Sequence, residues 1–142
     1  GKISQAKSLV GQISISESTS ILGWIEDDEL EDLMKKSSIF VLPSINEGLP
    51  MSLLNAMSSE TAVITSPVGG IPEIVENMRN GILIDPMSID ILSKTISELI
   101  LDSELRENLA RKALESTETL DITTYMPRMK EIWDSVSSKN RF

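Results

Sequence analysis

Two short stretches of the sequence combine glycine with an acidic residue just after an apolar run. Glu47 and Gly48 follow the apolar run at 39–44, and residues 69–73 read Gly-Gly-Ile-Pro-Glu after a second run. Glycine lets a ligand approach the main chain, and a helix that begins after such a turn aims free amides at that ligand. A carboxylate beside these amides suits a neutral hydroxyl, from which it only accepts hydrogen bonds. The pattern indicates a site for a sugar phosphate.

Each stretch also has an ordinary structural interpretation. An acidic residue such as Glu47 is favourable near the start of any helix, and Gly48 suits any turn. Gly69 and Gly70 do not form the G-x-G-x-x-G dinucleotide fingerprint, so tight-turn geometry and ligand approach both stay open for them.

The composition removes several classes of enzyme. The chain contains neither cysteine nor histidine, which excludes thiolate nucleophiles, imidazole-bound zinc and serine–histidine catalysis. Its net charge of -9 argues against nucleic acid or an anionic membrane surface as a partner. No cluster of aspartates offers a metal site, so we expect neither a metal nor a cofactor.

Short apolar runs alternate with amphipathic helical patterns along the chain. The runs predict strands within 38–44, 61–65 and 80–86, and helices are expected around them at 3–11, 26–36, 49–59 and 72–76. The residues at 20–24 suit the end of a further strand. This rhythm is typical of an α/β fold, a Rossmann-like parallel sheet with helices on both faces.

From Ser88 onward the sequence predicts only helices. Ser88 and Asp102 are candidate N-caps, and a last helical pattern covers 121–139. At 142 residues one domain is expected, and no repeat or linker divides it. A complete doubly wound domain normally starts on a strand whereas this chain starts on a helix, so we expect an N-terminally truncated domain.

The longest apolar runs fall short of the roughly 20 residues that span a membrane. The N-terminus also lacks the basic segment and apolar core of a secretory signal. We therefore expect a cytoplasmic protein, with a peripheral membrane location of a full-length protein as the alternative.

The order of these motifs resembles the C-terminal donor-binding domain of retaining GT-B glycosyltransferases of the glycosyl transferases group 1 family. The likeness runs from about Ser20 to Leu101 and rests on ILGWI, EDDELEDLMKKSSIFVLPS, NEGLPMSLLNAM, AVITSPVGGIPEIV and NGILIDP. The resemblance implies that residues 1–142 are part of a domain that binds a nucleotide-sugar donor.

The resemblance also implies roles for individual residues. Glu47 matches the first glutamate of the family's Glu-x7-Glu motif, which contacts the donor sugar and is the expected catalytic residue. The other implied donor contacts are the backbone at Gly48 and Leu49, the diphosphate-binding amides of Met51, Ser52 and Leu53, Ile25 near the base, and Gly69 and Gly70 beside the pocket.

One position departs from the family motif. Asn55 stands where the second glutamate of the motif binds the ribose hydroxyls. Its carbonyl oxygen can still accept one hydroxyl proton, but the charge and the two-oxygen fork are lost. Asn55 is therefore either a weakened donor contact or an ordinary residue of the helix surface.

The implied activity is transfer of a hexosyl group, with retention, from a nucleoside diphosphate sugar to a glycan or lipid-linked acceptor, as in polysaccharide biosynthesis. The acceptor would bind an N-terminal domain that this chain lacks, so the fragment alone should be inactive. The alternative is a degenerate, non-catalytic interaction module that keeps the GT-B-like fold, which the change at Asn55 favours.

Overall fold

The computed structural model describes residues 2–118, which divide between Asp32 and Leu33 into two compact units. In the first unit, helix α1 covers Lys2–Gln12 and a short 3-10 turn covers Ser16–Ser18. The predicted first helix is therefore confirmed.

Residues 20–24, expected to end a strand, are not part of one. A strand exists only where a neighbouring backbone accepts and donates its hydrogen bonds. Within the described part of the chain this segment pairs with no other strand, and the side chain of Trp24 is 91% exposed. The local apolar pattern was therefore not sufficient to predict a strand.

Helix α2 covers Asp27–Lys36, as the sequence predicted. Three acidic residues fill its first turn and Lys35 and Lys36 its last, which complements the helix dipole at both ends. Near its end, the buried hydroxyl of Thr61 donates to the carbonyl oxygens of Met34 and Ser37, at 3.2 and 3.3 Å.

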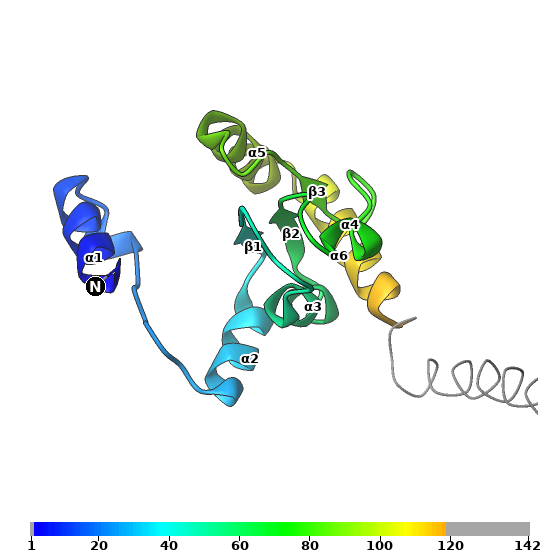
Figure 1. The fold of residues 1–142 in the computed structure, drawn as a ribbon, viewed down its shortest axis with the longest axis horizontal. Coiled ribbons are helices and arrows are strands. Elements are labelled where there is room, and N and C mark those ends of the chain that lie inside the picture. Colours follow the sequence, from blue (N-terminus) through cyan, green and yellow to red (C-terminus); the bar gives the residue numbers. More distant parts are fainter. Residues whose placement is uncertain (1, 119–142) are drawn as a thin grey trace, which may run out of the picture. The chain divides into compact units, whose positions relative to one another are not determined.

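The second unit is built on a three-stranded parallel sheet. Its strands are β1 (Ile39–Leu42), β2 (Ala62–Thr65) and β3 (Ile82–Leu83), side by side in that order. Ile39 is opposite Ala62 and Leu42 is opposite Thr65, so β1 and β2 end at the same level (Figure 1). The predicted α/β fold with a parallel sheet is confirmed.

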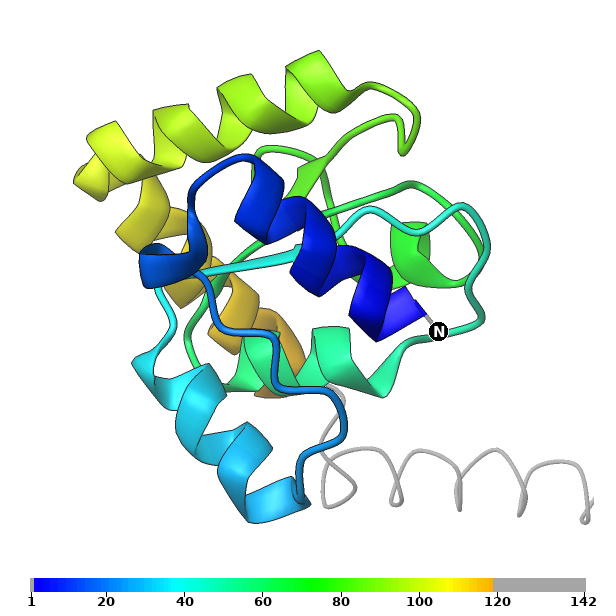
Figure 2. The ribbon, with the colours of Figure 1, turned by 90° about the vertical axis from the view of Figure 1, so that its left-hand side faces the viewer.

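Helices flank this sheet. They are α3 (Met51–Ser58), α4 (Ile71–Ile74), α5 (Ile89–Leu101) and α6 (Ser103–Glu118). Helix α6 packs against both β2 and α3, and α5 packs against α6 (Figures 1 and 2). The predicted helix at 121–139 lies outside the described residues.

The core lies between the sheet and helices α5 and α6. Every residue of β2 is buried, as expected for a central parallel strand. The cluster on one side of the sheet comprises Ala62, Ile64, Ile82, Ile84, Leu99, Leu109 and Ala110. Strand β1 is only half-buried, and within the described residues it pairs with β2 alone.

The two predicted N-caps differ. The carboxylate of Asp102 accepts a hydrogen bond from the amide of Leu105 at 2.9 Å, which caps α6 as predicted. Ser88 precedes α5 at the expected position, but its side chain makes no capping hydrogen bond. In the part of the chain that the structure describes, no helix has the length and apolar character needed to cross a membrane.

Candidate functional site

The predicted site residues of the second unit gather at one edge of the sheet. Strands β1 and β2 run parallel, so the segments that leave their carboxyl ends start from the same edge. One segment, residues 43–50, leads to α3, and the other, residues 66–70, leads to α4 (Figure 1). In open α/β sheets, ligands bind at this edge.

The two segments are joined by their backbones. The amide of Gly70 donates a hydrogen bond to the carbonyl oxygen of Gly48 at 2.8 Å. Gly69 has φ +57°, and a Cβ atom added to it would lie 1.9 Å from the carbonyl oxygen of Glu47. Gly69 therefore makes room for the neighbouring loop, and the approach of a ligand to Gly69 and Gly70 stays a prediction.

Glu47 is half-buried, and its carboxylate is held by a nearby hydroxyl. The Oγ atom of Ser44 donates to Oε1 of Glu47 at 2.7 Å, a normal length for a hydrogen bond to a carboxylate. Within residues 2–118, Oε2 has no hydrogen-bond donor. The second carboxylate oxygen therefore keeps its capacity to accept a ligand hydroxyl.

The start of α3 presents free backbone donors. The amides of Met51 and Ser52 meet no acceptor within the described residues, and Pro50 before them has no N–H. The amide of Leu53, by contrast, donates to the carbonyl oxygen of Pro50 at 3.1 Å. Its side chain is fully buried. Of the three expected amides, two are thus available to an anion.

Asn55 lies on the exposed side of α3. Its side chain makes no hydrogen bond to any of residues 2–118, although its backbone carbonyl accepts from the amide of Ser59 and the hydroxyl of Ser58. Leu49, another predicted contact, is 48% exposed. A Cβ on Gly70 would lie 3.6 Å from the Cβ of Leu49, so Leu49 borders both loops.

Ile25 is the one predicted donor contact that lies in the other compact unit. It belongs to the first compact unit, and the site described here is built from the second unit alone. Its expected contact with a nucleotide base stays a prediction.

Two serines at this edge were not singled out from the sequence. Ser44 holds Glu47, and a hydroxyl three residues from an acidic residue in a turn is the only signal that could have suggested the contact. Ser66 is completely buried directly after β2, and its Oγ atom has no hydrogen-bond partner among residues 2–118. Nothing in the sequence distinguishes it from neighbouring hydroxyl residues.

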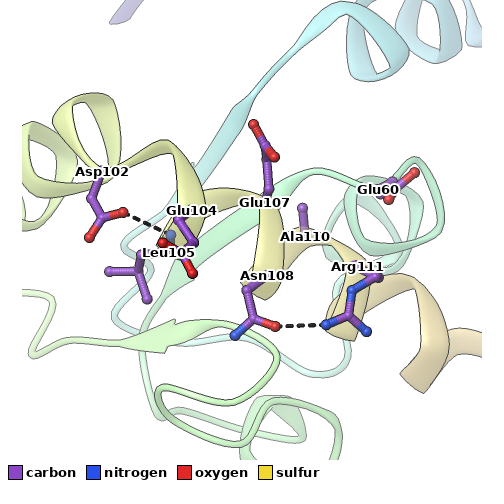
Figure 3. A pocket seen from close by; sticks show the side chains of 8 residues that line it. All are labelled: Glu60, Asp102, Glu104, Leu105, Glu107, Asn108, Ala110 and Arg111. Atoms are coloured by element: carbon purple, nitrogen blue, oxygen red, sulfur yellow. Dashed lines mark hydrogen bonds between the residues drawn. The ribbon is translucent and has the colours of Figure 1, made fainter.

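An open pocket of about 750 Å³ lies elsewhere, along α6. Figure 3 shows the side chains that line it. Asp102 accepts a hydrogen bond from the amide of Leu105, and Arg111 donates one to Asn108. Glu104 and Glu107 add negative charge to the pocket. No group of three or more acidic side chains in the described part of the chain could hold a metal ion. The pocket shares no residue with the Glu47 site.

Comparison with known proteins identifies the family. The family described as "Glycosyl transferases group 1" matches residues 2–116. A Campylobacter jejuni N,N'-diacetylbacillosaminyl-diphospho-undecaprenol alpha-1,3-N-acetylgalactosaminyltransferase is 32% identical over 76% of this chain, and the sulfoquinovosyl transferase SQD2 of Arabidopsis thaliana is 33% identical over 70% of it. The matched parts are 29% and 20% of these curated relatives, so the chain spans less than a third of either.

Solved structures have the same fold. The C-terminal domain of a glycosyl transferase group 1 family protein, LpcC from Francisella tularensis, is similar with a TM-score of 0.75 and 29% identity, covering 82% of this chain and 60% of that one. Anabaena HepE, solved in complex with UDP-glucose, has a TM-score of 0.81 at 21% identity, over 94% of this chain and 36% of HepE. The sequence match, the parallel sheet and these neighbours agree that this chain belongs to the glycosyl transferases group 1 family.

Proposed function

We propose that this chain binds the nucleoside diphosphate sugar donor of a retaining hexosyltransferase. The observation that carries the proposal is the arrangement at one sheet edge of the half-buried Glu47 carboxylate and the free amides of Met51 and Ser52. This edge offers an acceptor for sugar hydroxyls next to donors for a diphosphate.

Each part of the site would perform one task. The amides of Met51 and Ser52, at the positive end of α3, would bind the diphosphate and stabilise the negative charge that develops on it as the sugar leaves. The carboxylate of Glu47 would accept hydrogen bonds from the sugar and orient its ring. A Cβ added to Gly48 would meet no atom within 4 Å, so Gly48 would allow close approach of the sugar to the main chain on that side.

The comparisons support the chemical class of the ligand. HepE, a neighbour in fold, was solved with UDP-glucose, and the two curated relatives carry names of sugar transferases. Because the chain spans less than a third of those relatives, the acceptor, a glycan or lipid-linked molecule, would bind residues outside this chain. We propose that no metal takes part in donor binding.

The test is calorimetric titration of UDP-, GDP- and ADP-sugars into the protein encoded by the complete reading frame that contains this chain. We expect saturable binding of one donor, weakened about tenfold or more by Glu47→Ala, since a hydrogen bond to a charged group contributes about 1.5–3 kcal/mol. Glu107→Ala is the matched control, because Glu107 is an exposed glutamate of α6 beside the separate pocket.

Two results would refute the proposal: no saturable binding of any of these donors, or equal affinities for wild type and Glu47→Ala. If a donor binds, the anomeric configuration of the product, determined by NMR of a turnover mixture, tests retention. An inverted product would leave donor binding intact and overturn the retaining mechanism.

A second candidate function is a non-catalytic interaction module. The acidic pocket along α6 favours it, because this surface is separate from the Glu47 site and suits a basic partner (Figure 3). This candidate predicts that the protein binds no donor at all. The same titration therefore distinguishes the two functions.

A further inference from the structure

The hydroxyl of Ser44 has a different kind of acceptor from the hydroxyls of three other serines in the described part of the chain. Ser58 and Ser97 donate their hydroxyl protons to backbone carbonyl oxygens of their own helices, and Ser37 donates to a carbonyl oxygen of the helix that precedes it. Ser44 instead donates to a side chain, the carboxylate of Glu47, at 2.7 Å. Both partners are half-buried, so water screens this hydrogen bond less than it screens the exposed ones.

The backbone of Glu47 is fixed independently of its side chain. Its carbonyl oxygen lies against the Cα of Gly69, and the next carbonyl, that of Gly48, accepts the amide of Gly70. Fixing the backbone still leaves the rotatable bonds of a glutamate side chain free. Ordering such a side chain costs conformational entropy, and the binding of a ligand must otherwise supply this free energy.

We propose that Ser44 is a positioning residue that orders the Glu47 carboxylate before the donor binds, an inference that rests on the proposed function. Its hydroxyl donates a hydrogen bond to Oε1, and this bond orients the carboxylate. Oε2, which has no donor within residues 2–118, then accepts a hydroxyl of the sugar. Ser44 itself does not touch the donor in this arrangement and acts through Glu47 alone.

The position of Ser44 fits this task. It lies two residues beyond the end of β1, so its backbone is close to the rigid sheet, whereas Glu47 lies further along the loop. The hydrogen bond thus ties a loop carboxylate to the end of a strand. Preorganisation of this kind improves affinity by reducing the entropy that binding costs.

The test is a double-mutant cycle on donor affinity, measured by titration with the donor that the wild-type protein binds. The variants are Ser44→Ala, Glu47→Ala and the combination of both. Ser44→Ala should weaken binding about three- to tenfold, the range for loss of one ordinary hydrogen bond. Because Ser44 acts only through Glu47, the double variant should bind as weakly as Glu47→Ala and no weaker.

Two further variants separate positioning from general stability. Ser44→Thr keeps the hydroxyl and should recover affinity to within about twofold of wild type. Ser58→Ala removes another serine hydroxyl of the same strand–helix unit, one that bonds only the backbone of Asn55, and should leave donor affinity unchanged. A purely structural role for Ser44 would change the melting temperature without this pattern of affinities.

The outcomes are distinct. Wild-type affinity in Ser44→Ala, with reduced affinity in Glu47→Ala, overturns the positioning role and leaves the proposed function standing. Independent losses that multiply in the double variant would also overturn it, because Ser44 would then act by another route. The absence of donor binding by the wild-type protein would refute the proposed function together with this inference.

Discussion

The amide of Gly70 donates a hydrogen bond to the carbonyl oxygen of Gly48 at 2.8 Å. This bond joins the loop after β2 to the loop after β1, and Gly69 beside it leaves no room for a side chain against Glu47. The orientation of the Glu47 loop therefore depends on residues that follow a different strand.

Gly69→Ala should lower the free energy of unfolding of the chain by about 2–4 kcal/mol, because a Cβ would collide with the backbone of Glu47 at a positive φ. Urea unfolding measures this loss. Gly48→Ala is the control: a Cβ there meets no atom within 4 Å, so stability should stay the same or rise by up to about 1 kcal/mol. Equal losses in both variants would contradict the steric explanation.

Asn55→Glu should strengthen donor binding by about fivefold, because a carboxylate on this exposed position of α3 offers two charged oxygens to hydroxyls of the nucleotide. Asn55→Gln lengthens the side chain without adding charge and should bind the donor as wild type does. Calorimetry measures both affinities. If Glu and Gln variants bind alike, Asn55 is an ordinary residue of the helix surface.

Ser66→Ala should raise the free energy of unfolding by about 1 kcal/mol, because it removes a buried hydroxyl that has no hydrogen-bond partner in the described part of the chain. The neighbouring residue provides the opposite case. The hydroxyl of Thr65 donates to the carbonyl oxygen of Leu42 at 3.0 Å, so Thr65→Val should lower stability by about 1–3 kcal/mol. Denaturant midpoints of the two variants should therefore move in opposite directions, and a shift of both in one direction would refute the argument.

Asn80→Ala should destabilise the chain by about 2–4 kcal/mol. Asn80 is 3% exposed, accepts from the amide of Glu76, and donates to the carbonyl oxygen of Ile74 and the hydroxyl of Ser116. The side chain of the exposed Asn77 accepts a hydrogen bond from the amide of Leu83, and within residues 2–118 it makes no other, so Asn77→Ala should destabilise the chain less. Urea unfolding compares the two, and a larger loss in Asn77→Ala would refute the explanation from burial.

Glu115 gives stability a small dependence on pH. The hydrogen bond from Lys112, with a further one from Arg111, lowers the pKa of its carboxyl below the ordinary value of 4.5. Its contribution is thus present above the ordinary pKa and is lost as the pH falls through the lower folded pKa. Glu115→Gln should have a slightly lower melting temperature than wild type at neutral pH, and this difference should vanish in acid. If the difference in melting temperature persists in acid, its cause is packing of the Glu115 side chain rather than its charge.

The sequence was sufficient for features that depend on neighbouring residues. The apolar runs predicted β1 and β2, and the charge distribution of residues 26–36 predicted α2. It was insufficient where the partner lies far along the chain. The contact of Gly69 with Glu47 depends on a residue in a different loop, and in the described part of the chain no strand pairs with residues 20–24.

In the candidate site, too, the sequence predicted the features that depend on neighbouring residues. The strand–turn–helix pattern identified Glu47 and the free amides of Met51 and Ser52. It could not reveal that the Leu53 amide is already bonded to Pro50, or that Ser44 holds Glu47, because both depend on the exact path of the loop.

The backbone junction between Gly48 and Gly70 also decides how this domain can be re-engineered. Residues 43–50 cannot be exchanged alone for the loop of a relative, because the grafted backbone must still receive the Gly70 amide and pass beside Gly69. The smallest transplantable unit is therefore the pair of segments 43–50 and 66–70. A chimera that carries both segments should fold. In a chimera that carries only one of them, the grafted segment does not fit the native segment that it must contact.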